Sequence, residues 1–161
     1  MLNEVKLRNT QLEEIDPSSI PDIEAYQREK FKNPRGRFTS KIMELKSNEY
    51  NKAYKLKGGE DLIQITSLLN KGIIENWDKS VGGYIETFVP KGDDSYTEYI
   101  NLKESKAVIF FTKNYKSGNA NYILYQNTRQ NVTFFITYIS NSPDSVKINN
   151  MHNIIKEMRF E

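Results

Sequence analysis

The chain has 161 residues, a net charge of +2 and no cysteine. This length suits one domain that buries roughly 70% of its unfolded surface, and the absence of cysteine excludes disulfides and thiolate metal sites. No apolar run is long enough to span a membrane, and the N-terminus lacks the apolar stretch of a signal peptide. We therefore expect a single domain over residues 1–161, cytoplasmic in the form given, with a longer secreted form or a lipoprotein left open.

The charge is distributed unevenly along the chain. Residues 1–27 hold two basic residues against six acidic ones, a net charge of −4. Residues 28–57 hold ten basic residues against three acidic ones, a net charge of +7, and residues 58–161 are nearly balanced at −1. Such asymmetry is typical of a partner-binding surface, although a solvated, highly charged element gives the same pattern.

The first half of the chain contains few unambiguous patterns. Residues 1–20 predict a loosely ordered lead-in, which Pro17 and Pro21 close because proline interrupts a helix. A helix is predicted from Pro21 to about Phe31. The expected elements that follow are a strand over residues 36–46, for which a short helix is the alternative, a strand over 53–57 ending at Gly58-Gly59, and a helix over 60–77.

The second half predicts an antiparallel sheet. Alternating or continuous apolar segments are separated by turn residues, which is the pattern of strands joined by hairpins. The expected strands cover residues 84–89, 96–102, 106–112, 122–125 and 132–139. The last of these is apolar on both faces, so we expect both of its faces to be covered.

The C-terminal helix has the clearest pattern in the sequence. Ser142-Pro143-Asp144 combines a cap residue, a proline and an acid, as at a helix start. One apolar stripe follows, made of Ile148, Met151, Ile154, Ile155 and Met158. The predicted fold class is therefore α+β: one domain with an antiparallel sheet of four to six strands packed against two or three helices.

Residues 82–161 resemble the C-terminal part of the Mog1/PsbP-like fold, a twisted antiparallel sheet between helices. The resemblance is carried by element order: the hairpin from Val108 to Tyr125, then an aromatic strand, a Ser/Pro/Asp loop and an amphipathic helix ending in Arg159-Phe160-Glu161. The proline-aspartate-tryptophan strand entry usual in that family is absent. The resemblance implies a non-catalytic binding or adaptor role.

Few residues suggest catalytic or metal chemistry. His152 is the single histidine, and a partly exposed helix position is its simplest interpretation. The pairs Gly58-Gly59 and Gly82-Gly83 lack the spacing of a phosphate loop and indicate turns or bulges. Asp93, Asp94 and Glu98 do not have calcium-loop spacing, and Glu86 is expected on the open face of a strand. We therefore predict no enzyme activity, no cofactor and no metal.

The basic segment over residues 28–41 combines cations with aromatic side chains. Arginine forks bind carboxylates and aromatic rings fill pockets, so the segment predicts binding to another protein with an acidic surface. The predicted partner-binding residues are Arg28, Lys30, Phe31, Lys32, Arg35, Arg37, Phe38 and Lys41. We expect a bacterial immunity protein, an inhibitor or a secretion-system adaptor. Single-stranded nucleic acid is the alternative ligand, because it too is bound by cations and stacked aromatics, and a small enzyme with an unrecognised carboxylate site is a third hypothesis.

Overall fold

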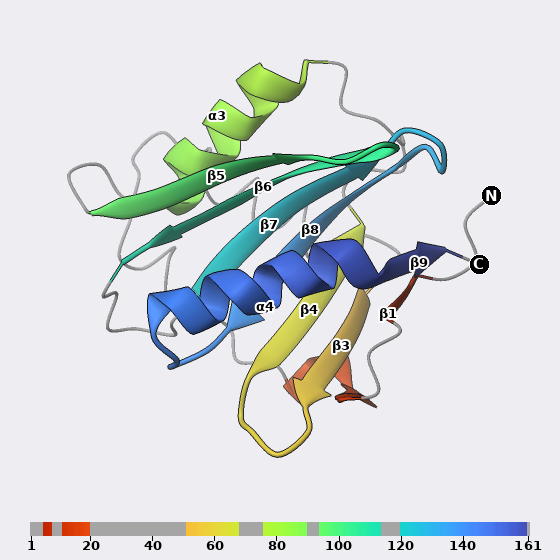
Figure 1. Cartoon of the computed structure of the whole chain (residues 1–161), viewed down its shortest axis with the longest axis vertical. Coiled ribbons are helices and arrows are strands. Elements are labelled where there is room, and N and C mark those ends of the chain that lie inside the picture. The colour runs from red at the N-terminus through yellow and green to blue at the C-terminus, as the bar shows by residue number, and fades with distance from the viewer. Residues whose placement is uncertain are drawn as a thin grey trace.

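The computed structural model describes residues 5–7, 11–19, 51–67, 76–89, 94–113 and 120–160. These residues form a seven-stranded antiparallel sheet with one α-helix on each side, plus a separate two-stranded ribbon (Figure 1). The α+β class is therefore confirmed, with more strands than the four to six expected. The helix predicted over residues 21–31 and the strand predicted over 36–46 lie outside the described residues.

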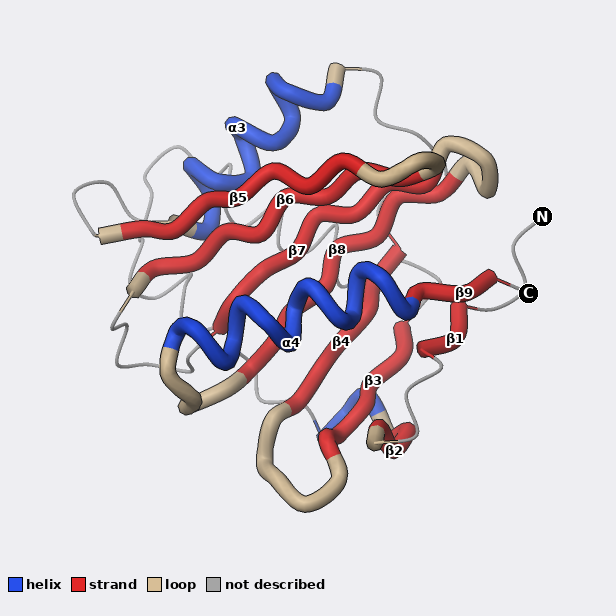
Figure 2. Tube along the Cα trace, in the orientation of Figure 1, coloured by secondary structure: helices blue, strands red, loops and turns tan. Residues whose placement is uncertain are grey.

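The sheet has the strand order β2-β3-β4-β8-β7-β6-β5, so β2 and β5 are its edges among the described strands. Figure 2 shows these strands as one layer, with α4 crossing its front. The strands of the sheet are β2 (Leu12–Ile15), β3 (Asn51–Leu56), β4 (Leu62–Ser67), β5 (Ser95–Asn101), β6 (Ser105–Thr112), β7 (Ala120–Asn127) and β8 (Val132–Ile139). The ribbon pairs β1 (Val5–Leu7) with β9 (Met158–Phe160), and a 3-10 turn, η1 (Pro17–Ser19), follows β2.

The predicted meander from residue 96 to residue 139 is confirmed as β5, β6, β7 and β8, each paired with the next. Between β7 and β8 the chain turns through Asn131, whose φ of 55° lies in the left-handed region that asparagine tolerates. Six consecutive side chains of β8 are buried, as expected for a strand covered on both faces.

Helix α4 (Asp144–Glu157) packs on one face of the sheet, as the apolar stripe predicted. Pro143 is itself the N-cap and no side chain caps this end, so the predicted cap at Ser142 is wrong. Met151, Ile154 and Ile155 are buried and Ile148 is partly buried. Met158, predicted as the last residue of the helical stripe, is buried too but belongs to β9. The α4-side core consists of Tyr54, Ile63, Ile65, Ala107, Ile109, Phe111, Ile123, Tyr125, Phe134, Ile136, Tyr138, Met151, Ile154, Ile155 and Met158.

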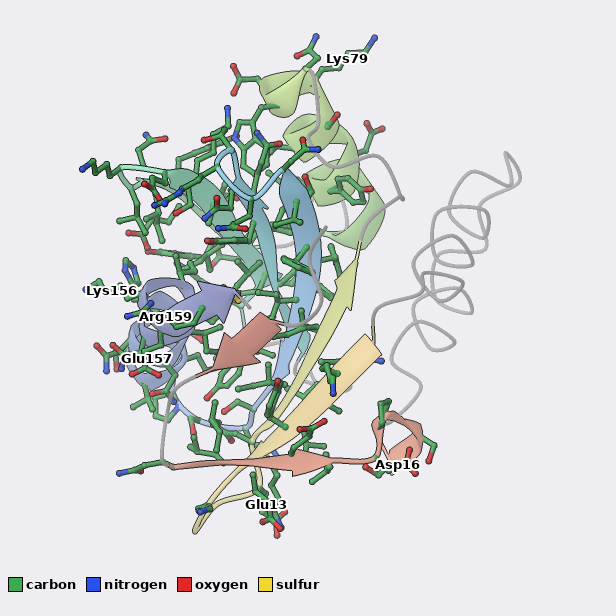
Figure 3. All side chains as sticks on the ribbon, turned by 90° about the vertical axis from the view of Figure 1, so that its right-hand side faces the viewer. Glu13, Asp16, Lys79, Lys156, Glu157 and Arg159 are labelled. Carbon is green, nitrogen blue, oxygen red and sulfur yellow. The ribbon has the colours of Figure 1, made fainter. Side chains whose placement is uncertain are left out.

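Helix α3 (Trp77–Phe88) covers the opposite face, and Figure 3 shows the sheet between the two helices. The Asn76 side chain accepts a hydrogen bond from the Lys79 N–H at 3.3 Å, which satisfies one open donor of the first turn. The α3-side core consists of Trp77, Val81, Tyr84, Val89, Val108, Phe110, Tyr122, Leu124 and Phe135.

Two predicted elements are wrong. Residues 62–67, expected in a helix over 60–77, form β4 between β3 and β8, because Ile63 and Ile65 alternate into the α4-side core. Residues 68–75 of that predicted helix lie outside the described residues. Residues 84–89, expected as a strand, largely belong to α3. The glycine pair Gly82-Gly83 therefore lies inside a helix rather than in a turn, whereas Gly58, with a φ of +78°, does occupy the predicted turn.

Candidate functional site

The predicted partner-binding residues lie outside the described part of the chain. This holds for all eight: Arg28, Lys30, Phe31, Lys32, Arg35, Arg37, Phe38 and Lys41. The basic segment therefore stays a prediction, and the site described below is built from the residues around α4 and β5.

Three titratable side chains meet where α4 crosses the edge of the sheet. Tyr96 and Glu98 are two residues apart on β5, so both side chains lie on the α4 face. The Tyr96 hydroxyl donates a hydrogen bond to Glu98 Oε2 at 2.6 Å, and His152 Nε2 of α4 lies 3.0 Å from the same oxygen. The side chains of Glu98 and His152 are 32% and 28% exposed, so solvent reaches the pair.

These contacts shift the pKa values of Glu98 and Tyr96. The hydrogen bond from the Tyr96 hydroxyl lowers the pKa of Glu98, and His152 adds to that effect. The same hydrogen bond raises the pKa of Tyr96 to about 12. A carboxylate beside an imidazole can orient the ring and accept its proton. Because His152 belongs to α4 and Glu98 to β5, this contact joins the helix to the edge of the sheet.

This contact predicts how stability changes with pH. Because the pKa of Glu98 is lower in the folded protein, its carboxylate stabilises the fold above its unfolded pKa, and this contribution is lost as the pH falls through the folded pKa. For Tyr96 the change of stability with pH has the opposite direction. Its contribution is complete below its ordinary pKa of 10.0 and is lost as the pH rises toward 12.

Urea unfolding across the acid range tests the Glu98 contribution. We expect the unfolding free energies of the native protein and Glu98→Gln to differ most near neutral pH and to converge on acidification. Glu86→Gln is the matched control, because Glu86 is exposed on α3 rather than on a strand as expected. Two curves that stay parallel down to strong acid would contradict the assignment.

A second polar cluster joins the β3–β4 connection, β8 and α4. The buried Tyr138 hydroxyl donates to Asp61 Oδ2, and Asn150 Nδ2 donates to the Tyr138 oxygen at 2.8 Å. Burial, followed by the hydrogen bond to Asp61, raises the pKa of Tyr138 to about 12. The tyrosine is therefore a neutral donor near neutral pH, and the cluster satisfies polar groups that burial would otherwise leave unpaired.

Large apolar side chains are exposed at the end of β5. Tyr99 is 54% exposed and Leu102, the next residue after the strand, is 41% exposed. Only Val146 of α4 joins them among the large hydrophobic residues of the described ranges. Tyr122, by contrast, is 3% exposed and belongs to the α3-side core.

Sequence reasoning missed both polar clusters, because their members are far apart along the chain. His152 and Glu98 are 54 residues apart, and Tyr138 and Asp61 are 77 residues apart. Among the described residues no group of three or more potential metal ligands comes together, and no helix there is long and apolar enough to cross a membrane. Comparisons with protein-family models, curated proteins and solved structures find no match to this chain.

Proposed function

We propose that the protein is a non-catalytic module that binds another protein. The observation that carries this proposal is the concentration of positive charge in one segment: net +7 over residues 28–57, in a chain whose total is only +2. A local basic segment steers an acidic partner into encounter without giving the whole chain an affinity for polyanions. Within this class we propose a bacterial immunity protein, an inhibitor or a secretion-system adaptor.

The residues within the segment support the same class of partner. Arg35 and Arg37 can each bind a carboxylate with two parallel hydrogen bonds, and Phe31 and Phe38 supply apolar anchors of the kind found in binding hot spots. Single-stranded nucleic acid is the second candidate ligand, favoured by this same alternation of cations and aromatic rings.

Charge reversal in the segment tests the proposal. The double variant Arg35→Glu/Arg37→Glu should slow association with the partner more than it speeds dissociation, because these charges act mainly on encounter. The partner is captured from native lysate and purified, and its binding rates are then measured by stopped flow. Unchanged association rates would contradict the proposal.

The matched control makes the same change of charge elsewhere. Lys79 and Lys103 are both exposed, and Lys79 lies at the outer end of α3 (Figure 3), so Lys79→Glu/Lys103→Glu should leave association nearly unchanged. A filter-binding titration with a single-stranded DNA oligonucleotide at two salt concentrations addresses the alternative. Tight, salt-sensitive DNA binding that disappears in Arg35→Glu/Arg37→Glu would replace the protein partner by a nucleic acid.

A further inference from the structure

The outer edge of β5 presents a defined set of backbone hydrogen-bonding groups. Leu102 N–H donates to Ser105 O at 2.8 Å, and Lys113 N–H donates to Asp94 O at 2.8 Å. Hydrogen-bonded pairs alternate along an antiparallel ladder, so these two bonds place the backbone groups of every even-numbered β5 residue toward β6. The odd-numbered residues therefore direct their N–H and C=O groups away from the sheet; they are Ser95, Thr97, Tyr99 and Asn101.

Within the described part of the chain, this edge lacks the features by which natural sheets prevent strand pairing. Charged side chains and short length usually protect an edge. The opposite edge, β2, is four residues long and carries Glu13 and Glu14, and Glu14 forms an ion pair with Lys52 at 2.9 Å. By contrast β5 is seven residues long, the residues that direct their backbone outward are all uncharged, and its single charge, Glu98, is engaged by Tyr96 and His152 on the α4 face.

We propose that the β5 edge pairs with β5 of a second copy of this chain, antiparallel about a twofold axis, with Tyr99 opposite Tyr99. In this register the outward N–H and C=O groups of odd-numbered residues face their counterparts, as a ladder requires. Thr97 pairs with Asn101 of the second copy, and the two Tyr99 rings lie beside each other. Paired aromatic rings on neighbouring strands stabilise a sheet.

The exposed side chains select this register. With Tyr99 at the twofold axis, Tyr96 lies opposite Leu102 of the second copy, so both exposed hydrophobic residues at this edge, Tyr99 and Leu102, are covered. A register centred on Glu98 would instead place two carboxylates directly opposite each other, which destabilises a strand pair. One pair of seven-residue strands is a small interface, so the dimer forms in a concentration-dependent equilibrium with the monomer.

Sedimentation velocity over a wide range of protein concentration tests the proposal. The full chain should shift from monomer to dimer as concentration rises. Thr97→Pro removes an N–H that points away from β6, a change that an edge strand tolerates, and it should weaken dimerisation on the order of tenfold or more because each copy loses a hydrogen bond. Thr97→Ala retains the N–H and is the matched control. Tyr99→Lys places like charges opposite each other and should also weaken the dimer, on the order of tenfold.

Cross-linking tests the register itself, since the chain contains no other cysteine. Thr97→Cys/Asn101→Cys should form a disulfide-linked dimer under mild oxidation, because opposed residues lie within disulfide reach. Each single cysteine is a control, since its symmetry mate lies about 14 Å away along the strand at about 3.4 Å per residue. A chain that stays monomeric at every concentration, or a dimer that Thr97→Pro and Tyr99→Lys leave intact, would overturn the proposal.

Discussion

Replacing Met151 with aspartate should unfold most of the protein under conditions in which the native chain is folded. Met151 is 0% exposed and lies in the α4-side core between the helix and the sheet. A carboxylate at this position would be buried without a partner, which costs more than about 4 kcal/mol. Total stabilities are only about 5–15 kcal/mol. Loss of the far-ultraviolet circular dichroism signal, or a greatly reduced midpoint in urea, measures the effect.

Two other positions on α4 provide a graded control. Val146 is 44% exposed in the first turn of the helix, where an acid interacts favourably with the helix dipole, so Val146→Asp should be nearly neutral. Ile148 is partly buried against the α4-side core, so Ile148→Asp should lie between the two. Equal midpoints for Val146→Asp and Met151→Asp would show that the apolar stripe does not hold α4 on the sheet.

The elements that the sequence predicted correctly are those in which local pattern and long-range packing agree. In β8, apolar residues on both faces indicated a covered strand, and the helices do lie on both sides. In α4, the apolar spacing identified the buried residues Met151, Ile154 and Ile155, although Met158, the last residue of the stripe, belongs to β9. Such agreement between levels is what makes a segment predictable from its own residues.

The errors arose where two periodicities fit the same residues. Leu62 and Ile65 begin a run with helical spacing, but for residues 62–67 pairing with β3 and β8 decides the outcome in favour of a strand. In residues 77–88 the glycine pair suggested a break, although Trp77, Val81 and Tyr84 lie on one helical face and are buried together. In both cases, contacts with residues far away along the chain overrode the local preference.

The polar contacts of the site were beyond sequence reasoning for a related reason. Glu98 was considered only together with Asp93 and Asp94, its neighbours in the chain. Its partners are Tyr96, two residues earlier on β5, and His152, on the helix α4 that packs over the sheet. Neither contact can be recognised from residue spacing. The position of His152 over β5 depends on how all the apolar residues of α4 pack on the sheet.

Replacing Phe135 with alanine should destabilise the protein by about 3–5 kcal/mol and loosen α3 in particular. Phe135 is 3% exposed in the α3-side core. Its ring centroid lies 5.9 Å from that of Tyr84 on α3, 5.5 Å from Tyr122 on β7 and 6.4 Å from Phe110 on β6. Removing the ring leaves a cavity and takes away aromatic contacts from each neighbour. Urea unfolding measures the total loss.

The next residue along the strand provides the matched control. Ile136 points to the opposite face and is 0% exposed in the α4-side core, so Ile136→Ala should cost a comparable amount, about 2–5 kcal/mol. Hydrogen exchange then separates the two faces, because local opening follows the packing that is lost. Phe135→Ala should speed exchange of the α3 amides more than those of α4, and Ile136→Ala should do the reverse. Identical exchange patterns in the two variants would mean that the two cores do not hold their helices separately.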